Sequence, residues 1–124
     1  MLKASFPELP FAFTDQGRLI ASLPMPNREG DLLLYDDGDE ITVFLGDITH
    51  CHFSQEYLGD GQYSPETEAC EELLDYLKDL FADRVIFYHR RNRTGDGSTQ
   101  LPTIDRANEL QAECKCFLWS RTLN

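Results

Sequence analysis

Residues 31–45, DLLLYDDGDEITVFL, decide the fold. Two apolar runs, residues 31–35 and 40–45, flank the acidic segment Asp-Asp-Gly-Asp. Asp-Gly between two such runs is a strong signal of a β-hairpin, because both residues tolerate the positive φ angles of a tight turn. We therefore expect two antiparallel strands joined by a turn at residues 36–39.

Four further strands are predicted from short runs of β-branched, aromatic and aliphatic residues bounded by Pro, Gly or polar residues. They cover residues 18–23, 48–53, 84–91 and 114–122. The polar, glycine-containing segment 92–100 is expected to be a loop. The pattern at residues 103–112 fits a short helix and an irregular segment equally well.

One long helix is predicted over residues 65–82. Ser64 is the expected N-cap, Pro65 suits the first turn, and Glu66 and Glu68 complement the positive end of the helix dipole. Apolar residues then recur at spacings of three and four, which is typical of an amphipathic helix. This stripe consists of Cys70, Leu73, Leu74, Leu77, Leu80 and Phe81.

These elements predict an α+β fold in the order β-β-β-β-α-β-β. A mostly antiparallel sheet of five to six strands would have the long amphipathic helix packed on one face. The chain has 124 residues, which is the usual size of one domain, so residues 1–124 are expected to form a single α+β domain. The sequence does not distinguish a monomer from a homodimer.

The charge is strongly acidic and unevenly distributed. The chain has 22 acidic and 11 basic residues, a formal net charge of −11. Residues 1–83 carry a net −14 and residues 84–124 a net +3. A net negative charge disfavours general nucleic-acid binding and anionic membranes, and it favours a basic protein partner.

A cytoplasmic location is expected. No apolar run approaches the ~20 residues of a transmembrane helix. Pro7, Glu8 and Pro10 precede any apolar stretch, which is not typical of a secretory signal. The four cysteines are therefore interpreted as reduced thiols.

A zinc site is one hypothesis for the chemistry of this chain. Alternate residues of a strand share a face, so His50 and His52 project together, as do Cys114 and Cys116. Two imidazoles and two thiolates form a chemically suitable tetrahedral set, provided that strands 48–53 and 114–122 are neighbours. The alternative is that both cysteines are small buried hydrophobic residues.

Other chemistry is less well supported by the sequence. A weak anion-binding site is predicted at Arg90, Arg91 and Arg93, because arginine presents paired donors to phosphate or carboxylate. Cys51 lies between two histidines, but adjacent strand residues face opposite ways, so neither is an obvious base for it. No glycine-rich phosphate-binding motif occurs, so nucleotide binding is not expected. No cofactor and no catalytic residue are predicted.

The favoured functional hypothesis is a non-enzymatic protein-binding module, such as an inhibitor or an immunity-type antidote of a basic protein. Carboxylates around an aromatic anchor would steer and hold such a partner. The candidate acids lie at the hairpin turn and on the helix: Asp36, Asp37, Asp39, Glu40, Glu71, Glu72, Asp75 and Asp79. Candidate anchors are Tyr35, Tyr57 and Tyr63. The alternatives are the zinc protein or enzyme and an accessory domain that forms a homodimer.

Overall fold

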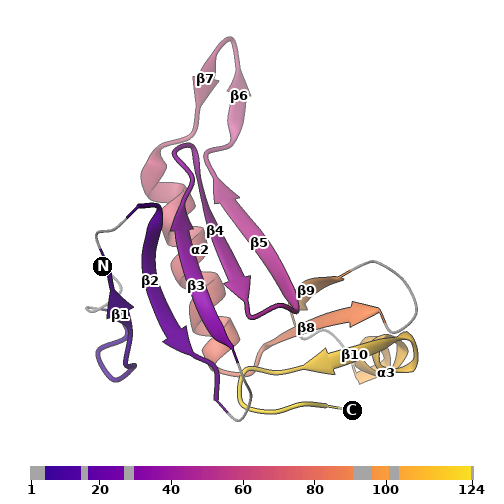
Figure 1. Ribbon diagram of the computed structural model, residues 1–124. Coiled ribbons are helices and arrows are strands. Elements are labelled where there is room, and N and C mark those ends of the chain that lie inside the picture. The colour runs from indigo at the N-terminus through magenta and orange to yellow at the C-terminus, as the bar shows by residue number, and fades with distance from the viewer. Residues whose placement is uncertain (1–4, 15–16, 27–29, 91–95, 101–103, 124) are drawn as a thin grey trace.

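The computed structural model describes residues 5–14, 17–26, 30–90, 96–100 and 104–123. Its largest element is an antiparallel five-stranded sheet in which the strands lie side by side in chain order (Figure 1). The strands are β1 (Ala12–Phe13), β2 (Leu19–Pro24), β3 (Asp31–Asp36), β4 (Glu40–Leu45) and β5 (Thr49–Ser54). This sheet and its main helix confirm the predicted α+β class.

The predicted hairpin is the centre of this sheet. β3 and β4 are paired from Leu32 opposite Leu45 to Asp36 opposite Ile41. The Asp36 carboxylate accepts a hydrogen bond of 2.9 Å from the backbone N–H of Gly38, whose φ is +93°. Glycine is suited to this position because it has no Cβ to clash at positive φ.

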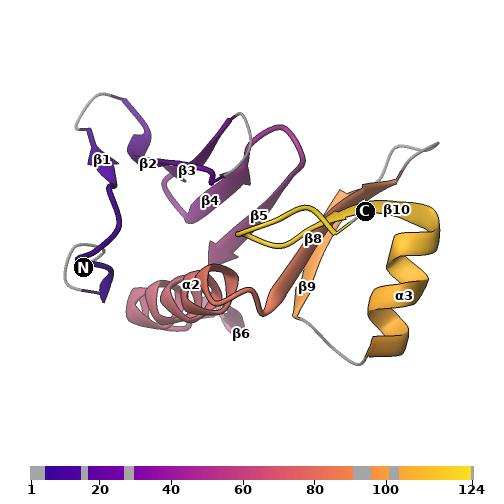
Figure 2. The ribbon, with the colours of Figure 1, turned by 90° about the horizontal axis from the view of Figure 1, so that it is seen from below.

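Helix α2 (Glu66–Phe81) covers one face of the sheet (Figures 1 and 2). Leu73, Leu77 and Leu80 of the predicted stripe are buried, together with Ala69, which was not part of it. The other three members, Cys70, Leu74 and Phe81, are only partly buried. The predicted Ser64 cap is wrong, because no side-chain hydrogen bond caps this helix. The Ser64 hydroxyl instead accepts a hydrogen bond of 2.6 Å from the backbone N–H of Glu56.

Alternation along β3 and β4 gives the sheet two different faces. Leu34, Val43 and Leu45 are buried in the core that faces α2. Among the residues that alternate with them, Leu33, Tyr35 and Phe44 are only partly buried, whereas Thr42 is buried. No described helix lies on that second side of the sheet (Figure 2), which is called the open face below.

The C-terminal strands form a separate sheet instead of extending the first one. Its order is β10 (Cys114–Phe117), β8 (Val85–Arg90), β9 (Asp96–Gln100), all antiparallel. β9 occupies part of the segment expected to be a loop. The open question at residues 103–112 is resolved as helix α3 (Ile104–Glu113).

The last predicted strand is shorter than expected. β10 ends at Phe117, where the chain turns back so that Phe117 and Thr122 form an isolated bridge.

The separate sheet has a physical cause in β8, which is buried on both faces. Phe87 joins the main core and Ile86 joins a second core under α3.

Tyr76 of α2 connects the two sheets. Its hydroxyl hydrogen-bonds to the Ser98 hydroxyl of β9 at an O–O distance of 3.1 Å and also to the Cys51 thiol of β5. Burial raises the pKa of Cys51 above its usual 9.0, although its hydrogen bond with Tyr76 lowers it in part. Burial, with a smaller contribution from the Cys51 charge, also raises the pKa of Tyr76 above its usual 10.0.

These shifts predict a loss of stability in alkali. Above pH ~9 the unfolded chain releases protons that the folded chain retains, so the free energy of unfolding falls as pH rises. Tyr76→Phe should reduce that slope by at most about 1.4 kcal/mol per pH unit near pH 11. The exposed-tyrosine control Tyr63→Phe should leave it unchanged. Urea unfolding between pH 7 and 11 measures the slopes, and equal slopes for both variants would contradict the assignment.

Candidate functional site

The open face contains a hollow of about 540 Å³. This volume lies within the range of small-molecule and side-chain binding pockets. The hollow is lined by residues of β3, β4 and β5, of the turns that join them, and by the residue before β2: Arg18, Leu33, Tyr35, Asp37, Thr42, Phe44, Gly46, His50 and His52.

Four rings form a row across this face. Tyr35 of β3 and Phe44 of β4 meet edge to face with ring centroids 5.5 Å apart. Phe44 stacks with His50 of β5 at 5.3 Å, and His50 is 5.1 Å from His52. The side chains meet because Phe44 is directly opposite His50 in the register of β4 and β5. Cross-strand aromatic pairs of this kind stabilise a sheet.

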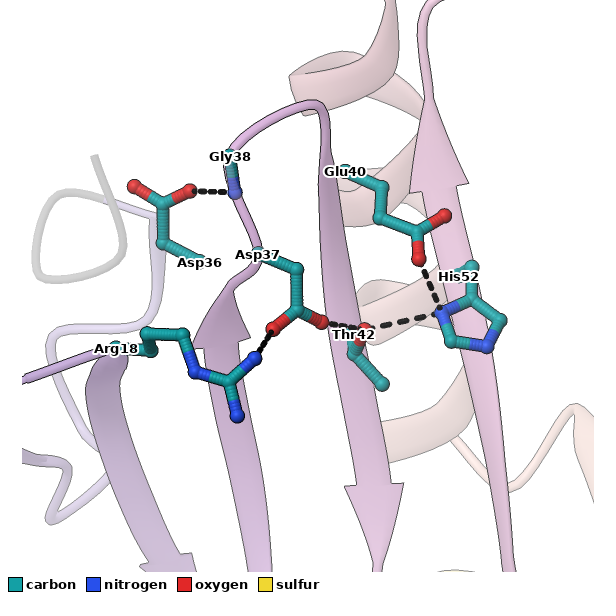
Figure 3. A network of polar contacts seen from close by, with 7 residues as sticks. All are labelled: Arg18, Asp36, Asp37, Gly38, Glu40, Thr42 and His52. Carbon is teal, nitrogen blue, oxygen red and sulfur yellow. Dashed lines mark hydrogen bonds and ion pairs between the residues drawn. The ribbon is translucent and has the colours of Figure 1, made fainter.

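A chain of polar contacts lies at one end of the row (Figure 3). The Thr42 hydroxyl donates to Asp37, whose other carboxylate oxygen binds the Arg18 guanidinium at 2.7 Å. Thr42 is only 2 % exposed. Because its one hydroxyl proton goes to Asp37, the Thr42 oxygen accepts from Nδ1–H of His52 at 2.9 Å. The same nitrogen lies 3.3 Å from Glu40 Oε1.

This arrangement does not form a catalytic triad. In a triad the hydroxyl and the carboxylate bind opposite nitrogens of the histidine, so that one nitrogen can accept the hydroxyl proton. Here Thr42 and Glu40 share Nδ1 of His52, and the Thr42 proton is donated to Asp37. The network therefore holds side chains in position and fixes the tautomer of His52.

Replacing Thr42 tests this positioning. Thr42→Val keeps the β-branched shape but leaves Asp37 and His52 without their shared partner, so it should lower the free energy of unfolding by about 1–3 kcal/mol. Thr42→Ser retains the hydroxyl and should be affected less. Urea unfolding monitored by Trp119 fluorescence measures both variants. A valine variant as stable as the serine variant would exclude a structural role for the hydroxyl.

A second surface feature is a projecting hairpin, residues 57–63, called the finger below. Strands β6 (Tyr57–Gly59) and β7 (Gln62–Tyr63) extend beyond the end of the five-stranded sheet (Figure 1). Asp60 and Gly61 form its turn with φ angles of +52° and +74°. Tyr57, Leu58 and Tyr63 are 60 %, 60 % and 59 % exposed.

The root of the finger is held by Ser64, which is buried. Across the root, the backbone N–H of Ser64 donates to the Glu56 carbonyl at 2.8 Å. The backbone N–H of Glu56 donates in return to the Ser64 hydroxyl at 2.6 Å. The Gln55 amide donates to the Ser64 carbonyl at 2.6 Å. Thus Ser64 ties the finger to the end of β5 directly before α2 begins.

An acidic cleft of about 300 Å³ lies between the β3–β4 turn and the first turns of α2. Its carboxylates come from Asp36, Asp39, Glu40 and Glu66. Its apolar lining includes Ile41 and Phe53. Two stretches that are separate in sequence thereby form one negatively charged surface.

The predicted acidic residues divide between different environments. Asp36, Asp39 and Glu40 line the cleft, whereas Asp37 is paired with Arg18. The four predicted acids of the helix lie outside the cleft lining. Glu71, Glu72 and Asp75 are exposed on α2, and Asp79 is 3.7 Å from Arg84. Tyr35 belongs to the ring row.

The structure does not bring together the four residues of the predicted zinc site. β5 pairs with β4, and β10 pairs with β8, so the strands that carry the two pairs are not neighbours. His50 and His52 line the open face, while Cys114 and Cys116 are buried in the second core. Among the described residues no group of three or more metal-ligating side chains occurs.

The predicted anion site is only partly within the described structure. Arg90 donates to Glu113 at 2.9 Å, so its charge is shared with a carboxylate. Arg91 and Arg93 lie outside the described residues.

Sequence reasoning missed the finger and the roles of Arg18 and Thr42. The Asp60-Gly61 dipeptide between Tyr57-Leu58 and Tyr63 was an available hairpin signal, because a two-residue turn with both φ angles positive favours these residues. No local signal indicates Arg18 or Thr42. Their partners are brought to them by strand register.

Comparisons with protein-family models, curated proteins and solved structures find no match to this chain. In the part of the chain that the structure describes, no helix has the length and apolar character needed to cross a membrane.

Proposed function

We propose that this protein is a non-enzymatic binding module that inserts its finger into a cleft of a basic partner protein. The observation that carries this proposal is the exposure of Tyr57, Leu58 and Tyr63 on a hairpin that projects beyond the sheet. Large exposed apolar side chains grouped on one projection are typical of interaction sites. Tyrosine is also enriched among the residues that dominate binding energy.

The contacts that hold the finger together support this role. Its turn is closed by a hydrogen bond of 3.2 Å from Gly61 N–H to the Tyr57 hydroxyl, and the two tyrosine rings are 5.2 Å apart. Ser64 fixes the root. A preorganised element loses less conformational entropy when it binds, so more of its contact energy contributes to affinity.

Charge supports a basic partner. The acidic cleft adjoins the N-terminal end of α2, which directly follows the finger, and Asp60 lies at the fingertip. A net charge of −11 accelerates encounter with a positively charged protein. A finger that occupies a cleft, with carboxylates that neutralise its basic rim, would act as an inhibitor or immunity-type antidote.

The first prediction for this function concerns the finger. Tyr57→Ala combined with Tyr63→Ala should weaken partner binding at least about 30-fold, because loss of one hot-spot residue costs about 2 kcal/mol or more and the losses at two residues do not add fully. Affinity capture from the source lysate identifies the partner, and titration calorimetry then measures the dissociation constant for the native protein and the variant. Equal affinity would contradict insertion of the finger.

Charge reversal provides the second arm of the experiment. Asp39→Lys with Glu40→Lys should weaken binding, mainly by slowing association at low salt. Glu72→Lys with Asp75→Lys makes the same change in net charge on α2, outside the cleft, and should have a smaller effect. Native mass spectrometry of the isolated protein distinguishes the alternative in which the finger pairs two copies of this chain.

A further inference from the structure

We propose that His50 and His52 form a binding site for a divalent transition-metal ion on the open face. The two residues are alternate positions of β5, so their imidazoles project to the same side. Their ring centroids are 5.1 Å apart with an interplanar angle of 80°. Neither histidine belongs to the finger or to the lining of the acidic cleft, so the proposed site is distinct from the partner-binding surface, although Glu40 contributes to both.

The separation of the two rings suits a shared ion. Imidazole nitrogens bind Zn²⁺ at about 2.0–2.1 Å, so two imidazoles on one tetrahedral ion have ring centres about 5 Å apart. The observed centroid separation of 5.1 Å matches this value. His50 is exposed and His52 is about half exposed, so both are accessible from solvent.

The surroundings of His52 prepare it as a ligand. Thr42 and Glu40 both bind Nδ1, which holds the proton on that nitrogen and leaves the lone pair on Nε2. Figure 3 shows Nε2 on the side of the ring directed away from Thr42 and Glu40. Metal-ligating histidines commonly donate their other N–H to a carboxylate in this way, which orients the ring and increases its basicity.

Charge and space also favour a cation. Glu40 adds a negative charge beside His52, and the positive charge of Arg18 is compensated by Asp37. Because no third metal-ligating side chain joins the pair among the described residues, water or an added ligand would complete the coordination. The hollow of about 540 Å³ provides room for it. Imidazole ligands select Zn²⁺, Cu²⁺ or Ni²⁺ over Mg²⁺.

Zinc titration of the full chain tests the site. Calorimetry at pH 7.5 under metal-free reducing conditions should show one Zn²⁺ per chain, with no binding of Mg²⁺. His50→Ala and His52→Ala should each weaken Zn²⁺ binding more than tenfold, whereas His89→Ala on β8 should not change it. Because His50 is exposed, its variant should fold normally, as far-UV circular dichroism would verify. Native-like zinc affinity in that folded variant, or no zinc binding by the native protein, would overturn the proposal.

A second comparison separates a prepared site from a chance pair of histidines. Glu40→Ala should weaken Zn²⁺ binding about tenfold, because loss of the carboxylate behind a metal ligand typically costs 10–100-fold in affinity. Asp75→Ala removes the same charge on α2, behind the sheet, and should leave zinc affinity unchanged. NMR of the imidazole ring should show zinc bound at Nε2 of His52. Equal affinities in the two carboxylate variants, or zinc bound at Nδ1, would overturn the role assigned to Glu40.

Discussion

The two-residue alternation of β3, β4 and β5, with one helix on one side, is the constraint on which this structure depends. Leu34, Val43 and Leu45 face α2 and are buried with its apolar stripe. Burial of a large apolar side chain contributes about 1.5–3 kcal/mol, so this layer sets the register of every strand in the sheet. A shift by one residue would place this apolar set on the open face and is therefore strongly disfavoured.

The same constraint assembles the open face. Once the inward residues are fixed, Thr42, Phe44 and His52 must face the other way, in register with neighbours on adjacent strands. The ring row and the Arg18–Asp37–Thr42–His52 chain follow from that register. The finger arises differently, because its short strands pair only with each other and Ser64 joins their root to the sheet. Two distinct surfaces thus result, one held by the core and one projecting from it.

Local patterns were sufficient for the elements whose signals are contained in a few residues. The β3–β4 hairpin has Asp-Gly at its turn, and α2 has an apolar repeat of three and four residues. Patterns were insufficient where two partners compete for one residue. Ser64 has the side chain of an N-cap, yet its hydroxyl accepts a hydrogen bond from Glu56, which comes from the strand end before the finger. The four-residue zinc site failed for the same reason, because pairing of β10 with β8 buries Cys114 and Cys116 in the second core, whereas His50 and His52 lie on the open face.

The sequence by itself determined the α+β class, the central hairpin, the amphipathic helix and the acidic character of the first 83 residues. Each of these depends on composition or on residues close together along the chain. Only the tertiary structure decided that the C-terminal strands form their own sheet and that carboxylates of the β3–β4 turn and of α2 line one cleft. The tautomer of His52 was also decided only by the tertiary structure, because Thr42 and Glu40 set it. The physical reason is that strand order and register join residues far apart in sequence, and burial of the whole core, not any local motif, selects that pairing.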